Sequence, residues 1–308
     1  MTVRIGSIAR DAQPAPTPAV PALEDRHPCF SPTPEGHAQA ERLHLPVSPD
    51  CNIDCAFCKR DFGRQDPRPA SAARLLTPDQ AVAIVERAVE SCPTLSVVGI
   101  AGPGDPLASE HALDVFARVR SRWPNLTLCL STNGLMLPES IDQIAQLGVE
   151  TLTVTVNAVD PAIQAQITPK IAWHRHRLDG VAAGERLIAN QLAGIARAAA
   201  RGLTIKVNTV LIPTVNEDHI GDIAARVAAA GAQLINIIPL IPQHRFAHLP
   251  APGLMKRYVA RAEAECHLRV FHDCKPCRAD ACGVSGLTDY VAELYGDGLA
   301  AHPTFSHS

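Results

Sequence analysis

Short apolar runs rich in β-branched residues alternate with helical patterns along most of the chain, and this alternation restricts the fold more than any other feature. The predicted strands span residues 43–47, 96–101, 126–131, 151–157, 204–212 and 234–240. The predicted helices span residues 77–90, 109–122, 140–147, 185–201 and 217–229. Strands that alternate with helices of roughly 10–15 residues form βαβ units and a parallel sheet. The pattern predicts an α/β fold, a partial TIM-like (β/α)6 barrel.

The remaining sequence divides around this barrel, which we assign to residues 43–240. Residues 1–26 are rich in proline and alanine without periodicity, which is typical of a disordered leader. Residues 27–42 form a short N-terminal extension with one cysteine, and residues 241–308 form a less regular C-terminal extension with a C-x2-C pair. Residues 160–184 interrupt the alternation, and we interpret them as an insertion.

Charge and hydropathy exclude several classes of protein. The net charge of −3 argues against nucleic acid as the main partner, because phosphate binding requires a basic surface. No apolar stretch approaches the roughly 18 residues of a membrane span, and Met1–Arg10 lack the apolar core of a secretory signal. We therefore expect a cytoplasmic protein without membrane contact. In such a chain, ten cysteines indicate metal binding or catalysis rather than disulfides.

Three of these cysteines, Cys51, Cys55 and Cys58, have the spacing C-x3-C-x2-C directly after the first predicted strand. This position is a βα loop at the carboxyl-terminal rim of the sheet, where barrel active sites are built. Three thiolates can hold three irons of a [4Fe–4S] cluster and leave the fourth iron open. The alternative is a structural zinc site, which usually closes all four positions with paired C-x2-C units.

Polar or glycine-rich residues also follow the next three predicted strands. Together with the triplet, they resemble the radical S-adenosylmethionine (SAM) superfamily, in which SAM binds the open iron and is cleaved reductively. The resemblance covers roughly residues 43–240 and makes the triplet cysteines catalytic. The residues that it places around SAM are Phe57, Gly102, Pro103, Gly104, Asp105, Ser131, Asn133 and Asn157. It assigns Asp105 to the SAM amino group.

Longer segments resemble one branch of this superfamily, the NifB family of nitrogenase-cofactor (FeMo-cofactor) biosynthesis, a part of nitrogen fixation. They are HPCF at 27–30, RLHLPVSPDCNIDCAFCKR at 42–60, VVGIAGPGDPLA at 97–108, LCLSTNGL at 128–135, TVTVNAVDP at 153–161, IKVNTVLIP at 205–213 and CKPCRADACG at 274–283. The resemblance implies fusion of two substrate [4Fe–4S] units with a carbide derived from a SAM methyl group. It also implies an electron donor such as ferredoxin or flavodoxin, an iron–sulfur cluster donor, and carrier or scaffold proteins for the product.

The same resemblance assigns the other ligands. Cys29, Cys274 and Cys277 would hold one substrate cluster, and His37 and Cys129 would hold part of the other. From the residues alone, the C-x2-C pair could also be a redox pair or half a zinc site, and Cys129 could be a buried strand residue.

The sequence departs from the family at Arg64, where relatives carry a further cysteine. Because arginine cannot ligate iron, one of the two implied substrate-cluster sites lacks a thiolate. Either this chain is a diverged paralogue, or Cys92, Cys266 or Cys282 replaces the missing thiolate. Two further functions stay open: a radical SAM enzyme with one auxiliary cluster that modifies a peptide or small molecule, and a non-catalytic iron–sulfur carrier or zinc-binding scaffold.

Overall fold

The computed structural model describes residues 27–31, 36, 40–59, 71–272, 274, 277–284 and 287–296. The predicted leader, residues 1–26, lies outside the described residues, and so do His37 and Arg64. The sequence-based assignments for these positions therefore stay predictions.

The centre of the fold is one eight-stranded sheet with the order β10-β1-β2-β3-β4-β7-β8-β9. Six strands match the predicted ones and pair in parallel: β1 (Glu41–His44), β2 (Leu95–Ile100), β3 (Thr127–Thr132), β4 (Val149–Thr155), β7 (Thr204–Leu211) and β8 (Leu234–Pro239). The short β9 (Arg269–Val270) adds a further parallel strand beside β8. The predicted α/β class with a partial parallel barrel is confirmed.

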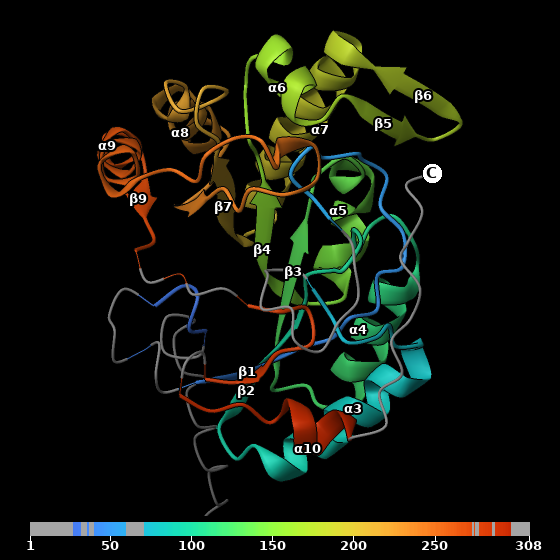
Figure 1. The fold of residues 1–308 in the computed structure, drawn as a ribbon. Coiled ribbons are helices and arrows are strands. Elements are labelled where there is room, and N and C mark those ends of the chain that lie inside the picture. Colours follow the sequence, from blue (N-terminus) through green and yellow to red (C-terminus); the bar gives the residue numbers. More distant parts are fainter. Residues whose placement is uncertain are drawn as a thin grey trace, which may run out of the picture.

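Helices lie along one side of this curving sheet, from α3 and α4 past α5 and α7 to α8 and α9 (Figure 1). They are α3 (Pro78–Ser91), α4 (His111–Arg122), α5 (Leu137–Gln146), α6 (Pro161–Ile167), α7 (Gly180–Ala200), α8 (Ile220–Ala229), α9 (Leu254–Glu265) and α10 (Val291–Tyr295), with a 3-10 turn η1 (His244–Phe246). Thr77 caps α3 through the backbone N–H of Gln80, whose side chain accepts from the Thr77 N–H, and Pro78 begins the helix. Such a capping box stabilises a helix start by about 1 kcal/mol.

The two faces of the sheet differ in chemistry. Side chains alternate along a strand, so Leu128 and Leu130 of β3 join the hydrophobic core below the helices, while Cys129 and Ser131 face the inner side. On β7, Ile205 and Val207 belong to the same core. Buried parallel strands are usually apolar on both faces. The polar inner face therefore marks the interior of this barrel as a place for binding rather than for packing alone.

The segment predicted as an insertion is a structured part of the barrel rim. It contains α6, a hairpin of β5 (Lys170–Trp173) and β6 (His176–Asp179), and the start of α7. Asp160 caps α6 by accepting from the N–H groups of Ala162 and Ile163. Helix α7 begins at Gly180, earlier than the predicted residue 185, because it follows directly on β6.

The C-terminal extension is more regular than predicted. The short β10 (Cys282–Gly283) pairs antiparallel with β1, and α10 packs against α3. Strand β1 begins at Glu41, two residues before the start of the predicted strand. The extension therefore covers the outer edge of β1, the strand that leads into the cysteine triplet.

Candidate functional site

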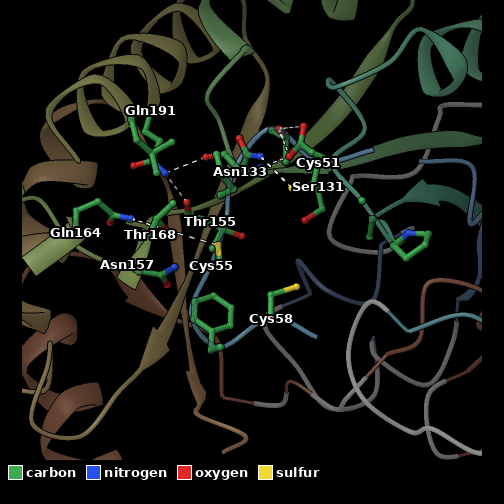
Figure 2. A pocket seen from close by; sticks show the side chains of 18 residues that line it. Cys51, Cys55, Cys58, Ser131, Asn133, Thr155, Asn157, Gln164, Thr168 and Gln191 are labelled. Atoms are coloured by element: carbon green, nitrogen blue, oxygen red, sulfur yellow. Dashed lines mark hydrogen bonds between the residues drawn. The ribbon is translucent and has the colours of Figure 1, made fainter. Parts of the chain in front are cut away.

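A pocket opens at the carboxyl-terminal rim of the sheet, and the three predicted cluster cysteines line it (Figure 2). The predicted SAM-contact residues that also line it are Phe57, Pro103, Gly104, Asp105, Ser131, Asn133 and Asn157. Gly102, which is also predicted to contact SAM, does not line the pocket. Sequence reasoning missed several further lining residues: Ile53, Ala101, Thr132, Thr155, Gln164, Thr168, Leu187 and Gln191.

Backbone hydrogen bonds to the neighbouring segment hold the cysteine loop in place. The N–H of Asp54 donates to Lys170 O at 3.0 Å, and the N–H of Ala56 donates to Ile167 O at 2.8 Å. An isolated antiparallel bridge also pairs Ile53 of the cysteine loop with Ile171 of β5 in the β5–β6 hairpin. The end of α6 and the start of β5 thus position the thiols.

The loop after β2 approaches the cysteine loop from the other side. The N–H of Gly104 donates to Ser48 O at 2.8 Å, and the N–H of Asp105 donates to Asp50 O at 2.7 Å. A Cβ at position 104 would lie 2.0 Å from Asp50 O, so only glycine fits this approach. Gly104, which the resemblance places around SAM, is therefore also required for the contact between these two loops.

The Asp105 carboxylate lies 4% exposed and is held by groups of the protein itself. It accepts from the Leu107 N–H at 2.9 Å, from the Thr132 hydroxyl at 3.0 Å and from the Asn133 N–H at 2.6 Å. Burial raises the pKa of Asp105, and these hydrogen bonds act in the opposite direction. The carboxylate therefore ties the loop after β2 to the loop after β3. Its predicted contact with the SAM amino group stays a prediction.

Asn133 occupies the junction between the cysteine loop and α7. Its side-chain nitrogen donates to Asn52 Oδ1 at 2.7 Å and lies 3.9 Å from Cys51 Sγ. Gln191 donates through one nitrogen to Asn133 O at 2.9 Å and to Thr155 O at 2.8 Å, as the dashed lines in Figure 2 show. The orientation of Asn133 is thus fixed from both sides.

The Cys55 thiol contacts the pocket wall at Thr168. Burial first, then the neighbouring Cys58 and Cys51, raise its pKa, while a contact with Thr168 lowers it. The Thr168 hydroxyl lies 3.6 Å from Cys55 Sγ and accepts from Gln164 Nε2 at 3.0 Å. A thiol in this environment binds as a thiolate only when a cation, such as cluster iron, offsets the cost of burying its charge.

The residues of the pocket fit a cluster with SAM. Three thiols converge on it, and two buried polar atoms of its wall, Gln164 Oε1 and Gln191 Oε1, have no hydrogen-bond partner among the described residues. Buried polar atoms of this kind usually pair with a bound ligand or water. In the part of the chain that the structure describes, no three His, Cys, Asp or Glu side chains surround the position of a single metal ion.

A second group of thiols lies around Arg42 of β1. Arg42 of β1 donates to Cys277 Sγ at 2.9 Å and interacts electrostatically with Cys29 and Cys274. Burial raises the pKa of the Cys129 thiol to about 11, and Cys29 and Lys206 also interact with this thiol electrostatically. The structure therefore brings Cys29 together with the C-x2-C pair, although about 245 residues separate them, and it sets Cys129 beside them.

The remaining cysteines lie elsewhere. Cys92 and Cys282 are 1% and 4% exposed, with sulfurs 3.7 Å apart at the contact of α3 with β10. Cys266 is exposed at the end of α9, and its thiol donates to Ala262 O. None of these three thiols lines the pocket, and the geometry fits packing for the first two. None of the ten cysteines forms a disulfide in the structure, and all ten lie among the described residues.

Comparison with known proteins defines the class. A family model for the radical SAM superfamily matches residues 45–227, and the chain belongs to that superfamily. The fold agrees: SuiB of Streptococcus suis, solved with bound S-adenosylmethionine, superposes with a TM-score of 0.55 at 12% identity over 77% of this chain and 50% of that chain. At this identity, the likeness shows the fold alone.

Curated relatives define the family more closely. The FeMo cofactor biosynthesis protein NifB of Methanocaldococcus jannaschii is 40% identical over 87% of this chain and 89% of its own length. The protein of the same name from Klebsiella pneumoniae is 41% identical over 88% of this chain, which spans 59% of that relative. The chain belongs to the NifB family, as the sequence resemblance predicts.

No helix among the described residues has the length and hydropathy to cross a membrane.

Proposed function

We propose that this chain is a radical SAM enzyme of NifB type, which assembles a carbide-containing iron–sulfur precursor of the nitrogenase cofactor. The observation that supports this most directly is that the fold gathers six cysteines into two groups. Cys51, Cys55 and Cys58 line the open pocket, and the group of Cys29, Cys274 and Cys277 lies around Arg42. A carrier or scaffold has no use for a SAM pocket beside the triplet cysteines.

The residues of the pocket have different proposed roles in binding the cluster and SAM. When bound, the [4Fe–4S] cluster and SAM supply reductive cleavage of SAM to a 5′-deoxyadenosyl radical, together with the methyl group for the carbide. The three triplet thiols would hold the cluster, and Asn133 is oriented toward Cys51 to position what lies beside it. Asn157 accepts from the Val210 N–H at 2.9 Å through its side-chain oxygen, so its amide nitrogen is the group available to a ligand.

The substrate of this reaction would be iron–sulfur clusters bound by the second group of thiols. Cys29, Cys274 and Cys277 supply three thiolates for one of them, and Cys129 contributes to the other. Partners of the proposed reaction are an electron donor such as ferredoxin or flavodoxin, a cluster donor, and a carrier for the product. Because ten cysteines without a disulfide are typical of a reducing compartment, we also propose a cytoplasmic location.

The experiment tests the two groups of cysteines with separate variants. The triple variant Cys51→Ala, Cys55→Ala, Cys58→Ala should form no 5′-deoxyadenosine from SAM after reduction with dithionite. The triple variant Cys29→Ala, Cys274→Ala, Cys277→Ala should bind about four irons fewer than the wild type after anaerobic reconstitution. The exposed Cys266→Ala is the matched control and should retain both properties. Formation of 5′-deoxyadenosine by the first variant would overturn the proposal.

A further inference from the structure

A buried lysine lies on the inner face of β7. Lys206 is 6% exposed, and its Nζ lies 5.1 Å from the ring centroid of Phe30 and 5.3 Å from that of Phe271. Among the residues that the structure describes, no carboxylate forms an ion pair with this ammonium group, and the two rings are its close contacts. Ring faces attract a cation, but they do not neutralise its charge.

A second buried cation faces the same space from β1. Arg42 is 4% exposed and donates through Nη2 to Cys277 Sγ at 2.9 Å. Its Nε is buried without a hydrogen-bond partner among the described residues. Arg42 and Lys206 both interact electrostatically with Cys129 and with His27. The two cations therefore lie near the same two side chains on the inner side of the barrel.

Thiols approach these cations from three parts of the chain. The Arg42 charge interacts with Cys277, Cys29 and Cys274, and the Lys206 charge interacts with Cys274 and Cys129. Two cationic side chains are thus within electrostatic reach of the C-x2-C pair and of the cysteine of β3. Neither cation belongs to the pocket that the triplet cysteines line.

This arrangement is costly for the protein alone. Burying a cation without an anionic partner is strongly unfavourable, and apolar residues of similar volume are often neutral or better for stability. A neutral thiol does not offset a full charge. A [4Fe–4S] unit bound by three thiolates carries a net negative charge, and its sulfides and thiolates accept hydrogen bonds. Such an occupant matches both the charge of the two cations and the groups that they face.

We propose that Arg42 and Lys206 are the electrostatic binding determinants for the iron–sulfur substrate. They attract the anionic cluster to the thiols of Cys29, Cys274 and Cys277 and offset the repulsion between it and a second anionic cluster at Cys129. This inference rests on the proposed function and deepens it, because two clusters that are to be fused must approach each other closely. Neither residue ligates iron; both are positioning residues.

The test counts only substrate iron. In the Cys51→Ala, Cys55→Ala, Cys58→Ala background, all bound iron belongs to the second group of thiols. In this background, Lys206→Met should bind less iron after anaerobic reconstitution and lose it to a chelator at least about tenfold faster. Lys206→Arg keeps the charge and should behave like the parent. Arg42→Met should weaken iron binding in the same way, and Arg42→Lys should weaken it less.

Stability of the iron-free protein separates a binding role from a structural one. The unfolding temperature of iron-free Lys206→Met should equal or exceed that of its parent, because an unpaired buried charge has been removed. The inference would be overturned by full iron binding with unchanged chelator kinetics in Lys206→Met. It would also be overturned if Lys206→Met lowered the unfolding temperature and Lys206→Arg lost iron equally. If the parent background itself binds no iron, the proposed function fails and the inference fails with it.

Discussion

At the scale of single residues, the Thr168 hydroxyl is a determinant of the cluster site that sequence reasoning did not find. It accepts a hydrogen bond from Gln164 Nε2 at 3.0 Å and lies 3.6 Å from Cys55 Sγ. A hydroxyl has one hydrogen, and an incoming donor from Gln164 leaves that hydrogen directed at the sulfur. No motif signals this contact, because a threonine at a helix end is common and its partner is 113 residues away.

We predict that Thr168→Val lowers the reduction potential of the cluster on Cys51, Cys55 and Cys58 by about 30–60 mV. A hydrogen bond to a thiolate ligand stabilises the more reduced, more negative state of a cluster, so its loss makes reduction harder. Thr168→Ser retains the hydroxyl and serves as the control. The measurement is a redox titration followed by electron paramagnetic resonance. An unchanged potential in Thr168→Val would show that the hydroxyl does not donate to the sulfur.

At the scale of elements, the strands and their order follow from the sequence, whereas two segments do not. The six predicted parallel strands are present with shifts of at most three residues at their ends, since alternation of strands and helices is a local signal. The role of residues 160–184 depends on backbone pairing with the cysteine loop, which side-chain patterns do not encode. The pairing of β10 with β1 involves only two residues of β10 and leaves a similarly weak signal.

Strand β1 carries a pH-sensitive contact with the C-terminal extension. His44 Nδ1 lies 3.1 Å from Arg278 O, and burial, followed by the charge of Arg42, lowers the pKa of His44 to about 4. The unfolded chain therefore binds a proton more readily than the folded one between pH 6.5 and about 4. The stability contributed by neutral His44 is present above pH 6.5 and is lost as the pH falls through about 4.

We predict that His44→Gln reduces the loss of unfolding free energy between pH 7 and pH 4 by about 2–3 kcal/mol. Glutamine does not titrate, and its amide nitrogen can still donate to the Arg278 carbonyl. Urea unfolding at both pH values measures the effect. His267→Gln, at an exposed position, is the control and should follow the wild type. Equal acid sensitivity of the His44 variant and the wild type would contradict this explanation.

At the scale of the whole molecule, the sequence identifies the chemistry of both thiol groups but not what surrounds them. The triplet and the C-x2-C pair are visible as spacings, whereas the convergence of Cys29 with Cys277 on Arg42 depends on how the two extensions fold over the inner side. Arg42 and Lys206 alternate with core residues on their strands, so their sequence context resembles that of any half-buried strand. Their burial is visible only after closure of the barrel.

The meeting of both extensions at one place predicts that iron binding orders them together. Cys29 belongs to residues 27–31, and Cys277 precedes the segment 278–284 that pairs with β1. Ligand binding to a site made from two segments suppresses local opening of both. Hydrogen exchange measured by mass spectrometry should therefore slow at least about tenfold in residues 27–31 and 277–284 when the protein is loaded with iron.

The matched variant tests whether the two segments respond as one unit. In Cys29→Ala, loading with iron should no longer slow exchange in residues 277–284, although that segment keeps both of its own cysteines. Exchange in the strands from β2 to β8 should be the same with and without iron, because their amides are already paired within the sheet. If residues 277–284 remain protected in Cys29→Ala, the C-x2-C pair binds its metal without the N-terminal extension. The second group of thiols would then be two separate sites.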